Sequence, residues 1–466
     1  IGLRNLNFIQ GLIFIGSIFI FINFFSPISD TISIITILLG VFLYIINFSK
    51  IKRKKNELYF LLFVLTFSFI YCFYAGTSDD FNYHYETIKN FKNKNLYEIL
   101  HHRTISYNSH WLFLNSIFSL SYLNSTLFIL TTLFFSISIY DLLKLSIVIT
   151  KNKNYYLSIL SFFFLIFFLG VLSNYKDLGT DIPGVIISMY ILIIIFNYFY
   201  NKDFESINND FLFLLLLGYF AFIIKITNSL IFLFLIFLFF KLSQKKKIYR
   251  MILVISLFPL PWVFQNFIIS GCLIWPISST CFINKELAIN EAYLIESFAK
   301  GDISTTMDIN NFDWIKIWFA NHFNKMLETY FVYFLILIMP IIYFLLKKKN
   351  KIDISYDFFK KNYLDINYKY ILLIVLVCNI FWFVYAPAYR FGLFYNSSLI
   401  ITLVLPLWIL ILRNNYSFII KFSKVILLLV SLYFIYENIN RISWYNERYY
   451  VWPPIEKNNL LKRIKF

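Results

Sequence analysis

Long apolar segments recur from one end of the chain to the other, and they constrain its fold more than any other feature. Each is about 18–22 residues long, so that as a helix it would cross the roughly 30 Å hydrocarbon core of a bilayer. Charged residues make up only 14% of the 466 residues and hydrophobic residues 59%, whereas a soluble domain carries about 25% charge. So few charges could not cover a soluble globule of this size. The sequence therefore predicts an all-α polytopic membrane protein.

The apolar pattern predicts about eleven full transmembrane helices. A further apolar stretch, 211–240, is interrupted by Lys225, Thr227 and Asn228, and it forms either one long tilted helix or a hairpin of two short helices. Basic flanks on both sides favour the hairpin, because both of its ends then stay in the cytoplasm. The predicted full spans are 8–25, 31–48, 58–75, 126–147, 155–172, 184–200, 250–268, 327–346, 370–386, 392–412 and 416–436.

The charge of the chain is strongly basic, with 42 Lys and Arg residues against 25 Asp and Glu residues. In a soluble protein this excess would indicate a nucleic-acid partner. Here the lysines gather at the ends of apolar segments, in Lys50–Lys55, Lys245–Lys247 and Lys347–Lys351, which is the pattern of cytoplasmic loops. We therefore expect a multi-pass protein of the cell inner (cytoplasmic) membrane, with the lipid bilayer and no nucleic acid as its partner.

Placing the basic runs in the cytoplasm sets the topology. The N-terminus is then cytoplasmic and the C-terminal tail is extracytoplasmic. The predicted organisation is a transmembrane domain over residues 1–436, with large outer loops at 76–125 and 269–326, and a tail at 437–466.

The first outer loop begins with a predicted amphipathic helix on the membrane surface. Ser78 is a good N-cap, and it places Asp79 and Asp80 in the first turn. Asp80 and His84 are four residues apart and share a face, so that they could accept a proton from a sugar hydroxyl or bind a phosphate. The alternative is that these acids only complement the helix dipole. The apolar face of this helix is formed by Phe81, Tyr85 and Ile88.

Four of the five histidines of the chain lie between residues 84 and 110. This clustering favours a polar cavity, and a zinc site is one alternative, although no HExxH or paired-cysteine motif supports it. A divalent cation (Mg²⁺ or Mn²⁺) held by Asp79 or Asp80 together with a phosphate is an equally open alternative.

Three further charged residues are candidates for the same site. Asp181 precedes Ile-Pro at a helix entry, where it is either a cap or a second acid. Arg390 lies in a tight outer turn, where it binds a lipid phosphate or snorkels to the headgroups. Lys225 needs a polar pocket or a neighbouring carboxylate, and we expect it closest to the cytoplasm of the three.

Two local features concern the second outer loop. Pro259 and Pro261 are expected to kink the span that leads into it. Cys272 and Cys281 both lie in this loop, and the outer compartment permits a disulfide, but two cysteines alone leave their pairing open.

Together with their neighbours, these residues form an ordered series along the chain. In order, it comprises Asp79 to His84, His102-Arg103, Tyr107-Asn108-Ser109-x-Trp111, Asp181-Ile182-Pro183, Lys225, Pro261-Trp262-x-x-x-Asn266 with Ser270-Gly271-x-Leu273-Ile274-x-Pro276, and Pro387-x-x-Arg390-Phe391. This series resembles a poorly characterised family of bacterial polytopic membrane proteins related to the GT-C-type glycosyltransferases, which use polyprenyl-phosphate-linked sugars.

The resemblance implies a GT-C-like fold with an acid of the first outer loop, Asp79 or Asp80, as catalytic base. This sequence departs from the family pattern at Gln265, where an arginine is expected before Asn266. The substrate-binding candidates are His84, His102, Arg103, Asn108, Asp181, Lys225 and Arg390.

The leading functional hypothesis is transfer of a sugar from a polyprenyl-phosphate donor to an extracytoplasmic glycan, lipid or protein. Arg390, Arg103 or Lys225 would balance the charge of the leaving phosphate. One alternative is a surface-polysaccharide polymerase, which joins lipid-linked oligosaccharides. A second alternative, from another class, is a flippase or transporter of lipid-linked sugars, although the sequence shows no inverted pair of broken helices.

Overall fold

In the part of the chain that the computed structural model describes, all regular secondary structure is helical apart from one isolated β-bridge between Cys272 and Cys281. That part comprises residues 4–50, 54–71, 83–99, 107–122, 127–147, 155–172, 178–201, 204–242, 245–301, 312–347, 366–414 and 416–445.

The helices follow the apolar segments of the sequence closely. The long helices are α1 (Arg4–Phe25), α2 (Asp30–Lys50), α3 (Lys54–Tyr71), α6 (Ile129–Ile147), α7 (Tyr155–Gly170), α8 (Asp181–Asn201), α9 (Phe204–Ile224), α13 (Lys285–Lys300), α15 (Asn324–Lys347), α17 (Ile366–Tyr385), α18 (Leu393–Asn414) and α19 (Tyr416–Tyr445). Shorter elements are α4 (Tyr85–Asn93), η2 (Leu96–Glu98), α5 (His110–Phe118), η7 (Ile226–Leu230), α10 (Ile231–Lys241), α11 (Lys245–Ile255), α12 (Leu260–Ser270), η8 (Ser278–Thr280), α14 (Trp314–Trp318) and η9 (Phe319–Phe323).

Within the described residues, nine helical segments are long and apolar enough to cross a membrane. Each coincides with a predicted span, and together they make the chain a multi-pass membrane protein. The other two predicted spans, 58–75 and 155–172, correspond to α3 and α7. Helix α3 starts with charged residues, and α7 has only 16 residues. The count of eleven therefore stays a prediction.

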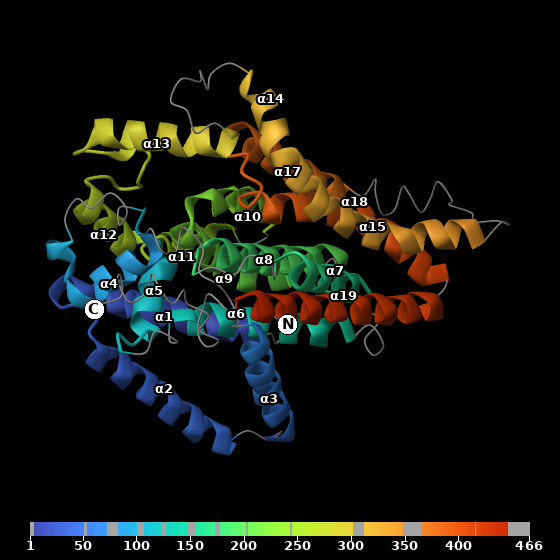
Figure 1. The fold of residues 1–466 in the computed structure, drawn as a ribbon, viewed down its shortest axis with the longest axis horizontal. Coiled ribbons are helices and arrows are strands. Elements are labelled where there is room, and N and C mark those ends of the chain that lie inside the picture. The colour runs from blue at the N-terminus through green and yellow to red at the C-terminus, as the bar shows by residue number, and fades with distance from the viewer. Residues whose placement is uncertain are drawn as a thin grey trace.

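Helix α8 lies at the centre of the bundle and α2 at its edge (Figure 1). In the most apolar stretch of each span, 89% of the residues of α8 are buried inside the protein, against 6% of those of α2. Both helices are apolar on all sides, which in a membrane protein fits either a buried position or a lipid-facing one. The apolar surface of α2 is therefore the part that lipid would cover.

The predicted hairpin at 211–240 is present as α9 and α10. Rings from the two helices pair along their length, with Phe211 against Phe239 and Phe222 against Phe232 at centroid distances of 6.0 and 6.2 Å. This pairing is antiparallel, and the chain turns back between Ile224 and Ile231. The first residue of α9, Phe204, and the last residue of α10, Lys241, therefore both lie at the open end of the hairpin.

The predicted proline kink is present as a short interruption of the helix at residues 256–259, between α11 and α12, inside one candidate span. Helix α11 ends at Ile255, and α12 begins at Leu260 with Pro259 at its N-cap and Pro261 in its first turn. Proline is favoured at these positions because the first N–H groups of a helix have no partner inside the helix.

The two short helices of the first loop differ in their environment. Helix α4 is amphipathic, as predicted, and it buries Ile88, Phe91 and Lys92, while the predicted start at Ser78 lies outside the described residues. Helix α5, in contrast, is almost entirely buried. Its His110 ring meets the Phe220 ring of α9 edge-to-face at a centroid distance of 5.9 Å. The first loop therefore penetrates the bundle instead of lying only on its surface.

The last helix, α19, has 30 residues and runs to Tyr445. The helix thus continues past residue 436, where the sequence predicted the start of the tail. The remaining tail residues lie outside the described part of the chain.

Candidate functional site

The tip of the α9–α10 hairpin carries a buried ion pair. Lys225 follows the last residue of α9 and has extended backbone angles, which end the helix. Its ammonium group pairs with the carboxylate of Asp181, the first residue of α8. The Lys225 nitrogen also lies 3.9 Å from the centroid of the Phe391 ring. A charge inside an apolar bundle needs such partners, because burial without them is costly.

A close approach between the hairpin and α8 sets this pairing. A Cβ atom added at Gly184 would lie 2.3 Å from the side-chain nitrogen of Asn228. That nitrogen donates a hydrogen bond to the Ala221 carbonyl at 2.9 Å, which fixes it at the tip. Glycine at 184 therefore allows the tip to reach α8 only three residues beyond Asp181.

The turn between α17 and α18 places a second cation beside the first. The Arg390 guanidinium lies 5.3 Å from the centroid of Phe391, the same ring that Lys225 contacts. The turn is held by two indole groups, with Trp318 donating to the Pro387 carbonyl at 2.7 Å and Trp382 to the Ala388 carbonyl at 3.0 Å. Two positive side chains thus flank one aromatic ring.

The first loop reaches the same place through Ser109. The Ser109 hydroxyl donates to the Ile224 carbonyl at 2.8 Å, directly before Lys225. The same hydroxyl accepts a hydrogen bond from the Trp111 N–H and so caps α5. The preceding residue, Asn108, has a φ of 36°, in the left-handed region that non-glycine residues rarely adopt.

Helix α12 contacts Asn108 through two of its side chains. The Trp262 indole donates to the Asn108 carbonyl at 2.7 Å, and the Asn108 side-chain nitrogen donates to Gln265 Oε1 at 3.4 Å. All three side chains are buried.

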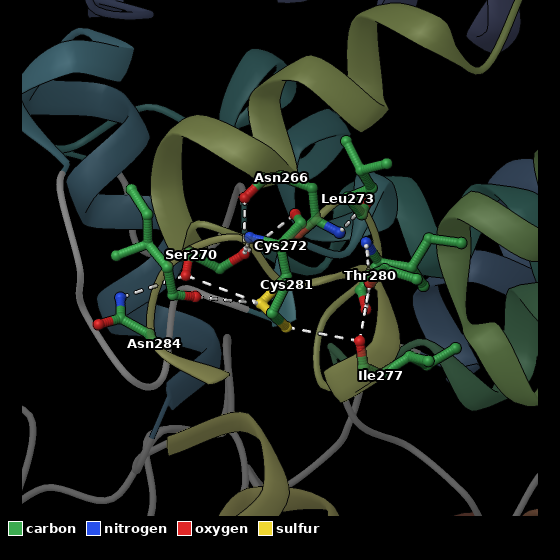
Figure 2. Close-up of a disulfide and its surroundings, with 10 residues drawn as sticks. Asn266, Ser270, Cys272, Leu273, Ile277, Thr280, Cys281 and Asn284 are labelled. Carbon is green, nitrogen blue, oxygen red and sulfur yellow. Dashed lines mark hydrogen bonds between the residues drawn. A yellow bond between two sulfur atoms is a disulfide. The ribbon is translucent and has the colours of Figure 1, made fainter. Parts of the chain in front are cut away.

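The second loop is closed on itself by a disulfide, which settles the pairing that the sequence left open. Cys272 and Cys281 are bonded to each other, and the loop between them is held by hydrogen bonds of Ser270 and Thr280 (Figure 2). Cys272 packs in a small apolar cluster that Tyr107 borders. The Tyr107 hydroxyl donates to the Glu291 carboxylate of α13 at 2.5 Å, so both loops meet beside Asn108.

The structure brings four of the predicted site residues into one region, namely Asn108, Asp181, Lys225 and Arg390. Lys225 lies at the hairpin tip, directly after the end of α9 and beside the start of α8. His84 is buried in the first loop, with its ring against Tyr83, and Tyr83 lies 6.2 Å from Tyr107. The other predicted residues, Asp79, Asp80, His102 and Arg103, lie outside the described residues.

In the described part of the chain, no group of three or more His, Cys, Asp or Glu side chains could hold a metal ion. The cation alternatives that the sequence raised concern Asp79, Asp80 and the His101-His102 pair, which lie outside that part.

Sequence reasoning missed the roles of Gln265, Asn228 and Glu291. Gln265 stood out only as a departure from the expected pattern, and Asn228 only as a polar interruption of an apolar stretch. A polar residue inside an apolar segment is the signal that could have identified Asn228, because such a residue needs a buried partner.

His110 is a further buried polar group next to this site. Burial lowers the pKa of its imidazole from 6.5 to about 3. Neither ring nitrogen has a hydrogen-bond partner among the described residues. The ring lies against Gly16 of α1, where an added Cβ would be 2.3 Å from Nε2. His110 is therefore neutral at physiological pH and packs as part of the core.

The fold and this site define a multi-pass α-helical membrane protein with a charged centre at the tip of a helical hairpin. The chain belongs to the family described as a domain of unknown function (DUF8201), whose model matches residues 5–397. That match includes every residue of the site described above and ends inside α18. No curated protein and no solved structure matches the chain.

Proposed function

We propose that this protein is a GT-C-type integral-membrane glycosyltransferase that moves a sugar from a polyprenyl-phosphate donor to an extracytoplasmic glycan, lipid or protein. The observation that carries the proposal is the pair of cations, Lys225 and Arg390, that flank Phe391 inside an apolar bundle. Cations in a water-poor site are suited to a phosphate group that becomes more negative during a reaction. In this proposal, a lipid-linked donor enters the site sideways from the bilayer.

In the proposed mechanism, Asp79 or Asp80 takes the proton of the acceptor hydroxyl. The hydroxyl oxygen then forms a bond to the anomeric carbon of the sugar, and the bond from that carbon to the phosphate oxygen breaks. The electron pair leaves with the phosphate, and Lys225, Arg390 and Arg103 balance its charge. Asp181 holds Lys225 in place, while His84, His102 and Asn108 contact the donor or acceptor. A divalent cation (Mg²⁺ or Mn²⁺) at Asp79 or Asp80 would add further positive charge on the phosphate.

The proposed orientation places this site on the extracytoplasmic face of the inner membrane, with a cytoplasmic N-terminus. Support comes from the Cys272–Cys281 disulfide, since disulfides persist in oxidising compartments outside the cytoplasm. The disulfide loop lies beside Tyr107 and so on the same side as the site.

The test uses membranes that contain the full-length protein and a radiolabelled polyprenyl-phosphate sugar. Asp79→Asn and Asp80→Asn are compared with Asp313→Asn, a control at an exposed carboxyl of the second outer loop. Removing a general base costs about 10²–10⁴-fold in rate. One of the first two variants should therefore lose nearly all transfer while the control keeps it. Full transfer by both site variants would refute the assignment of the base.

A second candidate function, a flippase or transporter of lipid-linked sugars, is favoured by one observation. The α9–α10 hairpin is a broken helical segment with an ion pair at its break, which is a frequent arrangement at transport sites. Proteoliposomes separate the two functions. Movement of labelled lipid-linked sugar across the bilayer without new glycosidic bonds would favour transport.

A further inference from the structure

Asn108 and Gln265 form a carboxamide pair buried between the first outer loop and α12. Their side chains are joined by the hydrogen bond from Asn108 Nδ2 to Gln265 Oε1, at 3.4 Å. At most 1% of either residue is exposed. The two residues are far apart in the sequence, so this pair exists only through the tertiary fold.

The pair leaves one acceptor and one donor without partners. Among the described residues, nothing forms a hydrogen bond with Asn108 Oδ1 or with Gln265 Nε2. Leaving such a group buried and unsatisfied costs about 1–3 kcal/mol. The two side chains are hydrogen-bonded to each other, so the acceptor Asn108 Oδ1 and the donor Gln265 Nε2 belong to neighbouring carboxamides.

The backbone around the pair is held in an uncommon conformation. Asn108 has a φ of 36°, and its carbonyl accepts the Trp262 indole N–H at 2.7 Å. The Trp262 ring packs in turn against Phe222 of α9 at a centroid distance of 5.8 Å. Backbone in this region costs free energy and persists where the surroundings enforce it, most often at binding sites.

The carboxamide pair lies close in space to Lys225, through the residue that follows Asn108. Ser109, the residue after Asn108, bonds to the carbonyl of Ile224, the residue before Lys225. A ligand whose charged group meets Lys225 and Arg390 could therefore present a neutral polar group to Asn108 and Gln265.

From this arrangement we infer that the carboxamide pair binds a sugar hydroxyl of the lipid-linked donor. Asn108 Oδ1 accepts the hydroxyl proton, and Gln265 Nε2 donates to a hydroxyl oxygen of the same or the neighbouring carbon. Trp262 positions Asn108 for this contact. The inference rests on the proposed function and assigns the recognition of the sugar to residues separate from those that bind the phosphate.

The experiment measures binding to the detergent-purified full-length protein by thermal shift. Two probes are compared, polyprenyl phosphate alone and the same carrier with a hexose on its phosphate. With the wild-type protein, we expect both to raise the melting temperature and the hexose-bearing carrier to bind more tightly.

The informative variants are Asn108→Gly and Gln265→Met. Glycine removes the carboxamide and tolerates the positive φ of residue 108. Methionine keeps the length of the side chain and removes the donor Nε2 without burying a charge. Each should bind the bare carrier as the wild type does and lose the advantage of the hexose, about fivefold to tenfold in Kd, which corresponds to one hydrogen bond.

A buried amide elsewhere is the matched control. Asn438→Leu removes a buried carboxamide from α19, far from this site in the sequence, and should retain both shifts. The inference is overturned if the Asn108 and Gln265 variants keep the full hexose advantage while the bare carrier still binds. Absence of any shift with either lipid on the wild-type protein would instead overturn the proposed function, and the inference with it.

Discussion

Two buried lysine–aspartate pairs hold this protein together, and they are arranged in opposite ways. In the Asp30–Lys92 pair, which ties α4 to α2, the lysine side chain is 2% exposed and the aspartate 27%. In the Asp181–Lys225 pair the lysine side chain is 19% exposed and the aspartate 8%. In the first pair the cation is the more buried partner, and in the second pair the anion is.

The partners of the first pair explain the difference. Lys92 is 2.7 Å from Asp30 and 2.8 Å from the Ser33 hydroxyl. Asp30 in turn accepts from the backbone N–H and the hydroxyl of Ser121, at 3.0 and 3.1 Å. Every contact of this pair joins one part of the protein to another, so its role is structural. The exposed member of the second pair is the cation, which is the member that an anionic ligand could reach.

The largest expected effect comes from removing that accessible cation. Lys225→Met should reduce sugar transfer by about 10²–10³-fold, because a charge that stabilises the leaving phosphate is lost. The double variant Asp181→Asn, Lys225→Met removes the buried carboxylate charge as well, so it should regain stability but not activity. Labelled transfer and melting temperature are measured together, with Lys316→Met, at an exposed lysine of α14, as the control. Recovery of activity in the double variant would show that Lys225 has only a structural role.

Lys92→Met should show the opposite pattern. It leaves Asp30 charged and without its ammonium partner, and breaking a buried pair in this way costs about 3–5 kcal/mol. Activity per folded molecule should stay near the wild-type value. Chemical denaturation in detergent measures the loss, and adding Asp30→Asn should restore part of it. A variant that is stable but inactive would mean that the two pairs do not differ in role.

Acid should lower the free energy of unfolding through the buried His110 of α5. The imidazole of His110 has a pKa of about 3 in the folded protein and 6.5 as the ordinary value. Between these values the unfolded state binds more protons, so stability falls as the pH drops from 6.5 towards 3. At pH 5 the loss is about 2 kcal/mol. Between pH 7 and pH 5 the melting temperature should fall less with pH for His110→Leu than for the wild type. Identical slopes of melting temperature against pH would contradict this account.

The smallest expected effect concerns the approach of the hairpin to α8. Gly184→Ala places a Cβ 2.3 Å from the Asn228 side chain, which must move and displace the tip that carries Lys225. Overpacking of this kind costs about 1–3 kcal/mol, and we expect the lower part of that range with a reduced transfer rate. Gly40→Ala in α2 is the control, since nothing lies within 4 Å of its added Cβ. Equal melting temperatures for the two variants would argue against a tight contact at Gly184.

Much of the fold could be predicted because the membrane simplifies the problem. Nine of the predicted spans coincide with helices long and apolar enough to cross a bilayer in the described residues, and the α9–α10 hairpin follows from its two basic flanks. The break at Pro259 follows from the missing N–H of proline. The burial of α5 could not be predicted in the same way, because its segment is short and its apolar residues fit a surface helix equally well.

The candidate site could be predicted in its members but not in its arrangement. Asp181, Lys225 and Arg390 were identifiable as charged residues in or beside apolar segments, and Asn108 was a candidate through the resemblance. Which of them meet depended on packing, and the carboxamide of Gln265 gained its role only from contact with Asn108. The proposed base, Asp79 or Asp80, remains a prediction of the sequence.

Composition and periodicity by themselves determined that this chain is a bundle of apolar helices, because each segment must satisfy its own backbone hydrogen bonds within a bilayer, whatever its neighbours. Only the tertiary structure decided that Lys225 meets Asp181 and Phe391, and that Asn108 meets Gln265. These contacts join segments far apart in the chain, and they depend on close approaches such as the one at Gly184 that no local pattern encodes.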